Sequence, residues 1–509
     1  MSTTSISSLL SSLAPSTETV AELLGETGTS SSTTATENAA LQDAVDAILN
    51  SATNTSGGGI DVTSTVDAIL EADATPEINL QTEVTNYNTQ TSALQSIEND
   101  LSSLQTAVQA LTDPAGAFSD VSVSSSNNDV VSATTANGTA AGSHIITVSS
   151  LATTSAAYSA DQLSATSSLP TGSLQIEVGS TGAVTIPVDQ ADGTDTLNGL
   201  ASYINNQDMG VTASVITDAS GSRLTLVSQT SGTAGDLTIT DNTGTSGSNG
   251  LGFTMATDAN GNDLGTNASL TVDGIPISSS SNTVTGVIPG VTLTLSGTSS
   301  TPVTLAVQPD LSSLSTAINN FVSAWNQVMN DINTQETYSS SGTEPPLLGD
   351  PSLDLVQSQL LQGISTSLSG NSGLVNLQSI GIQLQADGTL SVASSTSADS
   401  TDLNDALTNN FSAVQNLFQS ASGPGQTLAT ALTSLTDSVS GPLNSDMSGI
   451  NSEVTDLNNQ ISDFQSQLQD TQTQLTSEYS TINTTLEQLP ELIYSINSQI
   501  NALNPQNTQ

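Results

Sequence analysis

Two long stretches of apolar residues near the ends of the chain constrain its fold more than any other feature. They cover residues 80–111 and 447–489, and in both the apolar residues recur at intervals of three and four. This is the spacing of a coiled-coil seam, the stripe along which two helices pack. The predicted seam residues are Leu80, Val84, Tyr87, Leu94, Leu101, Leu104, Val108, Ile450, Val454, Leu457, Ile461, Phe464, Leu468 and Leu475.

The positions beside both seams carry mainly Ser, Thr, Asn and Gln, where most coiled coils have Glu and Lys. These polar residues are weak helix formers and offer no ion pairs across the seam. Neither helix should therefore be stable alone, and each is the expected partner of the other. Pro114 and Gly116 should end the first helix, and Pro490 should kink or end the second.

Between the two stretches, residues 119–308 have a different period. Short runs rich in Val, Ile and Thr alternate with clusters of Gly, Asn, Asp and Ser. This pattern predicts β-strands joined by turns. Only residues 196–207 have helical spacing, so we expect a β-rich region of two modules, the second inserted at about residues 171–265.

Helical spacing returns at Leu311, where Asp310 is the expected N-cap. Further helices are predicted at about 353–368 and 403–418. Between them, Asp387 and Gly388 should form the turn of a β-hairpin.

The predicted fold is therefore α+β and elongated, with an antiparallel coiled-coil leg of N- and C-terminal helices and β-rich head modules inserted between them. The expected segments are a Ser/Thr-rich flexible extension at 1–57, N-terminal leg helices at 58–118, the head at 119–308, a helical region with a hairpin at 309–440, the C-terminal leg at 441–503 and a tail at 504–509.

The pentapeptide VDAIL occurs twice, at Val45–Leu49 in the extension and at Val66–Leu70 in the N-terminal leg. The copies are three heptads apart. Two interpretations remain open: the first copy mimics the second and occupies the same groove, or the echo is a coincidence of composition.

Charge limits the partners of the chain. It has 48 acidic residues, one Arg and no Lys, which gives a formal net charge of −47. Such a chain cannot neutralise phosphates, which argues against nucleic acid and anionic membranes as partners. No stretch reaches the roughly 18 apolar residues of a membrane span. The N-terminal residues lack a basic region, and the scarcity of Lys and Arg suits a protein exposed to extracellular proteases, so export without a cleaved signal peptide is expected.

No group of residues predicts a catalytic, cofactor or metal site. The chain has no Cys, and His144 is its only His, so His144 is interpreted as a strand-surface residue. Arg223 should pair with a nearby acid such as Asp218. Residues 258–263 have the oxygen donors of a calcium loop, but the Gly stands at the wrong position, so a turn is favoured. Trp325 belongs to an apolar helical stripe and is expected in a core.

Several stretches, in this order, resemble the flagellar hook-associated protein 2 family. The N-terminal matches begin with GIDVTSTVDAIL and include TDPAGAF and GSHIITVSSL. The C-terminal matches include FVSAWNQVMNDI and IGIQLQADGTLSV. Residues 195–232 resemble the repeat that flagellins share with hook-associated proteins. The resemblance covers about residues 59–503, and ordinary members of the family start near the GID opening, so residues 1–58 are an extension.

The resemblance implies a non-enzymatic, homo-oligomeric cap, a ring that is pentameric by family resemblance, at the distal tip of the bacterial flagellar filament. Such a cap retains exported flagellin and promotes its polymerisation. The implied partners are the chain itself, flagellin, the type III export machinery and an export chaperone, and the implied location is extracellular. The alternative is a cell-surface adhesin with β-rich binding modules on a coiled-coil stalk, which the scarcity of aromatic residues disfavours.

Overall fold

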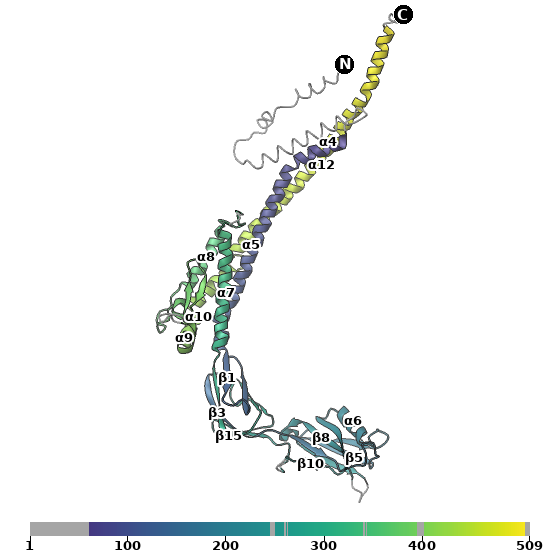
Figure 1. Ribbon diagram of the computed structural model, residues 1–509, viewed down its shortest axis with the longest axis vertical. Helices are drawn as coiled ribbons and strands as arrows, with labels where there is room; N and C mark the ends of the chain where they lie inside the picture. Colours follow the sequence, from purple (N-terminus) through teal and green to yellow (C-terminus); the bar gives the residue numbers. More distant parts are fainter. Residues whose placement is uncertain are drawn as a thin grey trace. The chain divides into compact units, whose positions relative to one another are not determined.

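A computed structural model of the protein describes residues 61–503 except 245–249, 259, 260, 262, 339–341, 343 and 394–401. The predicted extension at 1–57 and tail at 504–509 lie outside the described residues, as does the first VDAIL copy. Helices and antiparallel sheets build the described chain, which confirms the α+β prediction (Figure 1). The chain divides into two compact units. The first holds residues up to Glu98, Thr334–Leu353 and the chain from Asp437; the second holds Asn99–Asn333 and Asp354–Thr436.

Three helices form most of the first unit: α4 (Val62–Asp73), α5 (Thr75–Thr112) as far as Glu98, and α12 (Pro442–Leu503). Asp61 caps α4, because its carboxylate accepts hydrogen bonds from the backbone N–H of Ser64 at 3.3 Å and from the Ser64 hydroxyl at 2.8 Å. These bonds hold the pKa of Asp61 below its usual value. α4 packs against α12, and Figure 1 shows this part of α5 alongside α12.

The ends of the long helices differ in how well the sequence predicts them. α5 ends at Thr112, before Pro114 and Gly116, as expected. α12 continues through Pro490 to Leu503, so Pro490 does not end the helix. Proline leaves the carbonyl of Leu486 without its helical donor, but this stretch is solvent-exposed and water can bind that oxygen.

The second unit contains two β cores. The first combines a five-stranded sheet, in the order β1-β15-β3-β11-β12, with a three-stranded sheet, β13-β14-β2. Its elements are β1 (Val121–Ser125), β2 (Val131–Thr135), β3 (Gly142–Ser150), β11 (Ala268–Val272), β12 (Ile275–Ser279), β13 (Thr283–Thr285), β14 (Val291–Leu295) and β15 (Ser299–Pro309), preceded by η1 (Ala117–Ser119). Alternation along β3 buries Ile146 and Val148 in the core between the sheets and leaves Ile145 exposed.

The second β core is inserted between β3 and β11. It combines a three-stranded sheet, β6-β5-β9, with a four-stranded sheet, β10-β4-β8-β7, and one helix. Its elements are β4 (Thr154–Tyr158), β5 (Gly172–Val178), β6 (Val184–Val188), α6 (Leu197–Asn206), β7 (Val211–Asp218), β8 (Gly221–Ser231), η2 (Thr233–Gly235), β9 (Leu237–Thr243) and β10 (Thr254–Met255).

The helix predicted at 196–207 is confirmed as α6, which buries Leu197, Leu200 and Ile204 in the second β core. The expected start of the inserted module at residue 171 is too late, because β4 pairs with β8 of this core. A five-residue strand that pairs across more than sixty residues leaves no local boundary signal in the sequence.

Short helices complete the second unit around the last part of α5. They are α7 (Leu311–Glu336), α8 (Pro351–Ile364), η3 (Leu377–Ile380), α9 (Leu403–Asn409), α10 (Phe411–Gln419) and α11 (Pro424–Leu435), with the hairpin strands β16 (Ile382–Leu384) and β17 (Leu390–Val392). Asp310 caps α7 by accepting from the backbone N–H of Ser312 and Ser313, as predicted. The predicted hairpin is confirmed, with Gly388 at a φ of 79° in its turn. The helix predicted at 403–418 is two helices, because Asn410 leaves the helical conformation.

An aromatic core holds these helices together. Trp325 of α7 is fully buried, and its ring N–H donates to the carbonyl of Gly388 in the hairpin at 2.8 Å. The ring centroids of Phe321 and Trp325 are 6.4 Å apart, and those of Phe321 and Phe418 are 6.4 Å apart. Phe118, which follows α5, lies 5.8 Å from Phe418. The core prediction for Trp325 is therefore confirmed.

Candidate assembly surface

Two hydrogen bonds set the register between α5 and α12 in the first unit. The side-chain amide of Gln465 donates to Glu77 at 2.6 Å, and that of Asn444 donates to Glu98 at 2.6 Å. Moving 21 residues forward along α5, from Glu77 to Glu98, corresponds to moving 21 residues back along α12, from Gln465 to Asn444. The two helices are therefore antiparallel, and neutral side chains bind carboxylates where other coiled coils have ion pairs.

The predicted seam residues of this unit lie along both helices with graded burial. Leu94 is fully buried, and Ile450 and Leu457 are nearly so. The others are half-buried: Leu80, Val84, Tyr87, Val454, Ile461, Phe464, Leu468 and Leu475. Because a pair of helices covers each seam side chain from one side only, apolar area stays accessible along the seam. This face can accept a further apolar surface.

The remaining predicted seam residues, Leu101, Leu104 and Val108, have a different environment. They are buried, but they belong to the second unit, whereas all of α12 belongs to the first. Around them, the Gln426 amide donates to the Thr112 carbonyl and the Thr436 hydroxyl donates to the Gln105 side chain. The expectation that the whole 80–111 stripe pairs with 447–489 is therefore wrong for its last part, which packs with α7, α10 and α11.

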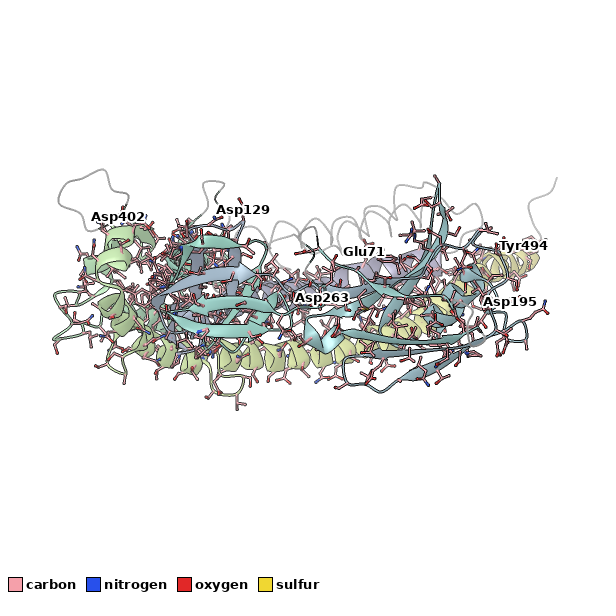
Figure 2. All side chains as sticks on the ribbon, turned by 90° about the horizontal axis from the view of Figure 1, so that it is seen from below. Glu71, Asp129, Asp195, Asp263, Asp402 and Tyr494 are labelled. Atoms are coloured by element: carbon pink, nitrogen blue, oxygen red, sulfur yellow. The ribbon has the colours of Figure 1, made fainter. Side chains whose placement is uncertain are left out.

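The C-terminal part of α12 exposes apolar side chains. Leu489, Leu492, Ile493 and Ile496, which we call the tip stripe, are 43, 62, 52 and 48% exposed. Among the described residues, no other helix lies beside this part of α12 (Figure 1). Nearby Tyr494, labelled in Figure 2, is 79% exposed. The tip stripe is thus an apolar surface without a partner in the described part of the chain.

Two pairs of carboxyl groups lie in contact, one in each unit. In the first unit, Asp446 of α12 meets Asp350, and the Ser352 hydroxyl bonds to both. Partial burial and then the neighbouring Asp350 raise the pKa of Asp446.

In the second unit, Asp100 of α5 meets Asp331 of α7. Partial burial and then Asp331 raise the pKa of Asp100 to about 6, and a buried oxygen of Asp100 has no hydrogen-bond partner. Sequence reasoning missed both pairs, because the members of each are far apart in the chain and have no distinguishing pattern.

The acidic side chains are otherwise spread over many elements, such as Glu71 on α4, Asp129 before β2 and Asp402 before α9 (Figure 2). Arg223 pairs with Asp161, to which it donates at 2.8 Å, and lies 5.5 Å from the ring centre of Tyr158. The expected pairing with Asp218 is therefore wrong. Strand β8 brings Arg223 beside a loop that precedes it by some sixty residues.

His144 contacts one acid. Its Nδ1 is 2.8 Å from Asp273, whose other oxygen accepts from the backbone N–H of Ile145 at 2.8 Å. The bonds to His144 and then to Ile145 hold the pKa of Asp273 below its usual value. This arrangement joins β3 to the turn after β11, and it includes no nucleophile.

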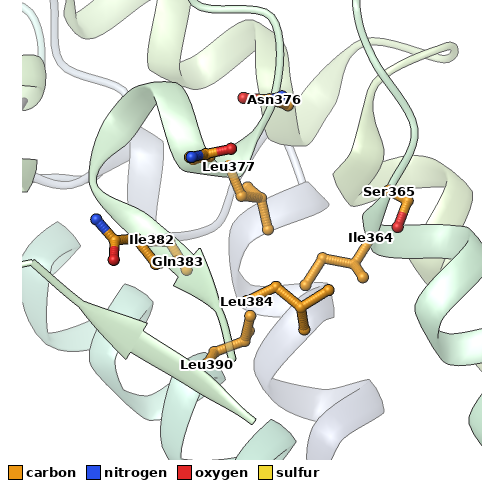
Figure 3. Close-up of a pocket in the computed structure, with 9 residues that line it drawn as sticks. Ile364, Ser365, Asn376, Leu377, Ile382, Gln383, Leu384 and Leu390 are labelled. Carbon is orange, nitrogen blue, oxygen red and sulfur yellow. The ribbon is translucent and has the colours of Figure 1, made fainter. Parts of the chain in front are cut away.

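A cavity of about 360 Å³ opens between α8 and the hairpin in the second unit (Figure 3). Ile364, Leu377, Leu384 and Leu390 line it together with neutral polar side chains. No charged side chain lines it, so it offers no acid–base pair for catalysis. In the parts of the chain that the structure describes, no three His, Asp or Glu side chains cluster as a metal site would require, and no helix is long and apolar enough to span a membrane.

Comparisons with known proteins match both ends of the chain to one family. The model of the flagellar hook-associated protein 2 N-terminus matches residues 58–155, and that of its C-terminus matches residues 265–491. The flagellin hook IN motif matches residues 173–230, within the inserted β core.

Individual relatives agree. The B-type flagellar hook-associated protein 2 of Pseudomonas aeruginosa is 31% identical over 394 residues, which are 73% of this chain and 81% of that protein. The flagellar hook-associated protein 2 of Escherichia coli K12 is 28% identical over 350 residues, or 66% of this chain and 74% of that protein. The crystal structure of the D1-D2-D3 domains of the Escherichia coli flagellar cap protein FliD is similar with a TM-score of 0.53 and 28% identity, covering 70% of this chain and 99% of that one.

Proposed function

Because this chain belongs to the flagellar hook-associated protein 2 family, we propose that it forms the cap at the distal tip of the bacterial flagellar filament. There it retains exported flagellin and promotes flagellin polymerisation beneath the cap. The observation that carries this proposal is the 31% identity over 81% of the Pseudomonas aeruginosa relative, together with the likeness to a solved flagellar cap protein. The role is structural, not enzymatic. The adhesin alternative gains no support from these comparisons.

Self-association is the basis of this function. The cap is a homo-oligomeric ring, with five copies as its expected size, and flagellin is its second partner. Apolar contacts hold the ring together, since the chain has one Arg and no Lys to form ion pairs between copies. The half-buried seam of α5 and α12 supports this proposal, because it leaves apolar area for a neighbouring subunit.

The leg of each copy consists of residues 58–118 and 441–503, and residues 119–308 and 309–440 form the head and the helical region. Within the leg, the coiled-coil seam uses Leu80, Val84, Tyr87 and Leu94 of α5, and Ile450, Val454, Leu457, Ile461, Phe464, Leu468 and Leu475 of α12. The register of the two hydrogen bonds between α5 and α12 supports this assignment.

The chain reaches the tip through the type III export machinery of the flagellum, with an export chaperone and without a cleaved signal peptide, and it works outside the cell. The single Arg and the absence of Lys support an extracellular location, because they leave trypsin-like proteases one cleavage site.

Gene deletion and complementation test the cap function. Deletion should leave short or absent filaments and monomeric flagellin in the medium, and the wild-type gene should restore filaments. Leu457→Asp, which places a charge in the seam, should restore them poorly. Asn458→Asp, which adds the same charge on an exposed position, should restore them fully. Filaments of normal length in the deletion strain would contradict the proposal.

Electron microscopy of the purified protein tests the ring. Five-fold rings are the expected result at high protein concentration. Rings of another order would overturn the pentamer and leave the cap function intact.

A further inference from the structure

The tip stripe of α12 needs an explanation, because three of its residues, Leu489, Ile493 and Ile496, keep the spacing of the coiled-coil seam and yet are about half exposed. The preceding part of α12 is covered by α4, a twelve-residue helix that packs on it. The question is which segment can continue this covering layer.

The register of the helices locates the site of α4. The hydrogen bonds Glu77–Gln465 and Glu98–Asn444 place each residue of this part of α5 opposite a definite residue of α12. One residue separates α4 from α5, so the same count carries α4 over about residues 469–480 of α12. On this count Val66 lies close to Leu475, and Val62 lies close to Tyr479.

The face that α4 presents to α12 occurs a second time in the chain, 21 residues earlier. On α4, Thr65 and Val66 are buried, and neighbouring apolar residues of that face are half-buried. The equivalent positions in residues 41–49 are all apolar. The pairs are Val62 and Leu41, Thr65 and Ala44, Val66 and Val45, Ile69 and Ile48, and Leu70 and Leu49.

One of these substitutions favours the earlier copy. The hydroxyl oxygen of Thr65 is buried without a hydrogen-bond partner, which costs stability. Ala44 has no polar side-chain atom, so a helix formed by residues 41–49 would present a fully apolar face.

α12 repeats its own face at the same interval of 21 residues. The residues that face α4 and its flanks have apolar counterparts further along the helix. These pairs are Leu468 and Leu489, Leu475 and Ile496, Tyr479 and Ile500, and Ile482 and Leu503. The same interval in both partners means that the earlier copy meets the tip stripe in the register that α4 has on its own site. Val45 then faces Ile496, and Ile48 faces Ile493.

The connecting chain is long enough. The centres of the two sites on α12 are 21 residues apart, but the gap from the start of α4 to the end of a helix at residues 41–49 is only about 20 Å, at 1.5 Å per helical residue. Residues 50–61 can span about 40 Å when extended. They include Gly57, Gly58 and Gly59, which favour flexibility.

We propose that residues 41–49 form a second α4-like helix that packs on the tip stripe of α12 in the same chain. The occupant is thus a segment of the extension, which precedes the region matched by the family models. The proposal does not rest on the cap function. It makes the extension an intramolecular cover for an apolar surface that would otherwise promote aggregation.

Disulfide trapping in the full-length chain tests this packing, because the chain has no Cys and each engineered pair is unambiguous. The test pair is Val45→Cys with Ile496→Cys. The matched control is Val45→Cys with Tyr494→Cys, two residues away on another face of α12. In a glutathione buffer, docking should give the test pair an effective concentration at least about tenfold above that of the control pair.

Three results of the trapping experiment would overturn the proposal. Equal disulfide formation in the two pairs would mean that the segment is tethered but not docked. A predominance of disulfide-linked dimers would identify a second copy of the chain as the occupant. Faster formation with Leu475→Cys than with Ile496→Cys would mean that the segment competes for the site of α4.

Hydrogen–deuterium exchange tests the same contact from both partners. Amides of residues 41–49 should exchange at least about tenfold more slowly in the wild type than in Val45→Asp/Ile48→Asp. The same loss of protection should follow from Ile493→Asp/Ile496→Asp, which leaves residues 41–49 unchanged. Asp46→Asn, equivalent to the exposed Asp67 of α4, is the control and should keep the protection. Protection that survives the α12 substitutions would overturn the proposal.

Discussion

Replacing Asp100 by Asn should stabilise the second unit at neutral pH. Partial burial and the facing Asp331 raise the pKa of Asp100 from 3.8 to about 6. When the pKa of an acid is higher in the folded than in the unfolded state, folding is favoured by the bound proton. The resulting stability is complete below about pH 4 and is lost as the pH rises to about 6. Above this range the folded protein bears the full cost of two adjacent carboxylates.

The size of the effect follows from the pKa and the exposure. The difference between 3.8 and about 6 corresponds to about 3 kcal/mol if it acts in full. Asp100 remains partly exposed, and solvent screening reduces this to about 1 kcal/mol. Asn carries no charge and can still donate an N–H to Asp331. We therefore expect Asp100→Asn to exceed the wild type by about 1 kcal/mol at pH 7.5 and to match it near pH 4.5.

Trp325 provides the assay. It is the only Trp of the chain, it is fully buried, and it lies on α7 with Asp331. Urea unfolding followed by its fluorescence gives the free energy of unfolding at each pH. Asp456→Asn, on the exposed face of α12, controls for the loss of one negative charge. The reasoning is refuted if Asp100→Asn is no more stable than this control at pH 7.5, or if its gain is the same at both pH values.

Three further predictions concern other contacts. Asp446→Asn should stabilise the first unit more at pH 7.5 than at pH 4.5, because burial and a facing carboxyl raise the pKa of Asp446; urea unfolding followed by circular dichroism at both pH values tests it. Leu94→Ala should cost about 3 kcal/mol, and Leu80→Ala clearly less, because Leu94 is fully buried and Leu80 is half-buried; equal losses in urea unfolding would contradict this. Arg223→Gln should cost less than about 1 kcal/mol, because Arg223 and Asp161 are 34 and 35% exposed; a larger loss would show that the pair is more than a surface contact.

Local patterns were sufficient where a residue's neighbours in sequence are also its neighbours in space. The period of apolar residues predicted α5, α6, α7 and α12, and the runs of Val, Ile and Thr predicted most strands of the two β cores. Caps and turns followed the same logic, as at Asp310 and at Gly388. Strand β4 and the break at Asn410 were missed, because pairing with a distant strand and packing of short helices decide them.

The seam residues show the limit of such patterns. Leu94 and Leu101 continue one stripe on one helix, yet the first belongs to the unit of α12 and the second to the unit of α7, α10 and α11. Nothing in the spacing distinguishes them, since both are buried leucines. The candidate assembly surface was therefore predictable as a face of two helices, but its length was not.

The sequence by itself determined the α+β class, the two long amphipathic helices, the strand-rich middle region and a surface almost without cations. These properties depend on side-chain period and composition, which act over a few neighbouring residues. Only the tertiary structure decided which surface covers each apolar face, that Arg223 pairs with Asp161, and that Asp100 meets Asp331 and Asp446 meets Asp350. The physical reason is that an apolar stripe requires burial without specifying a partner, whereas a charge contact depends on where distant segments meet.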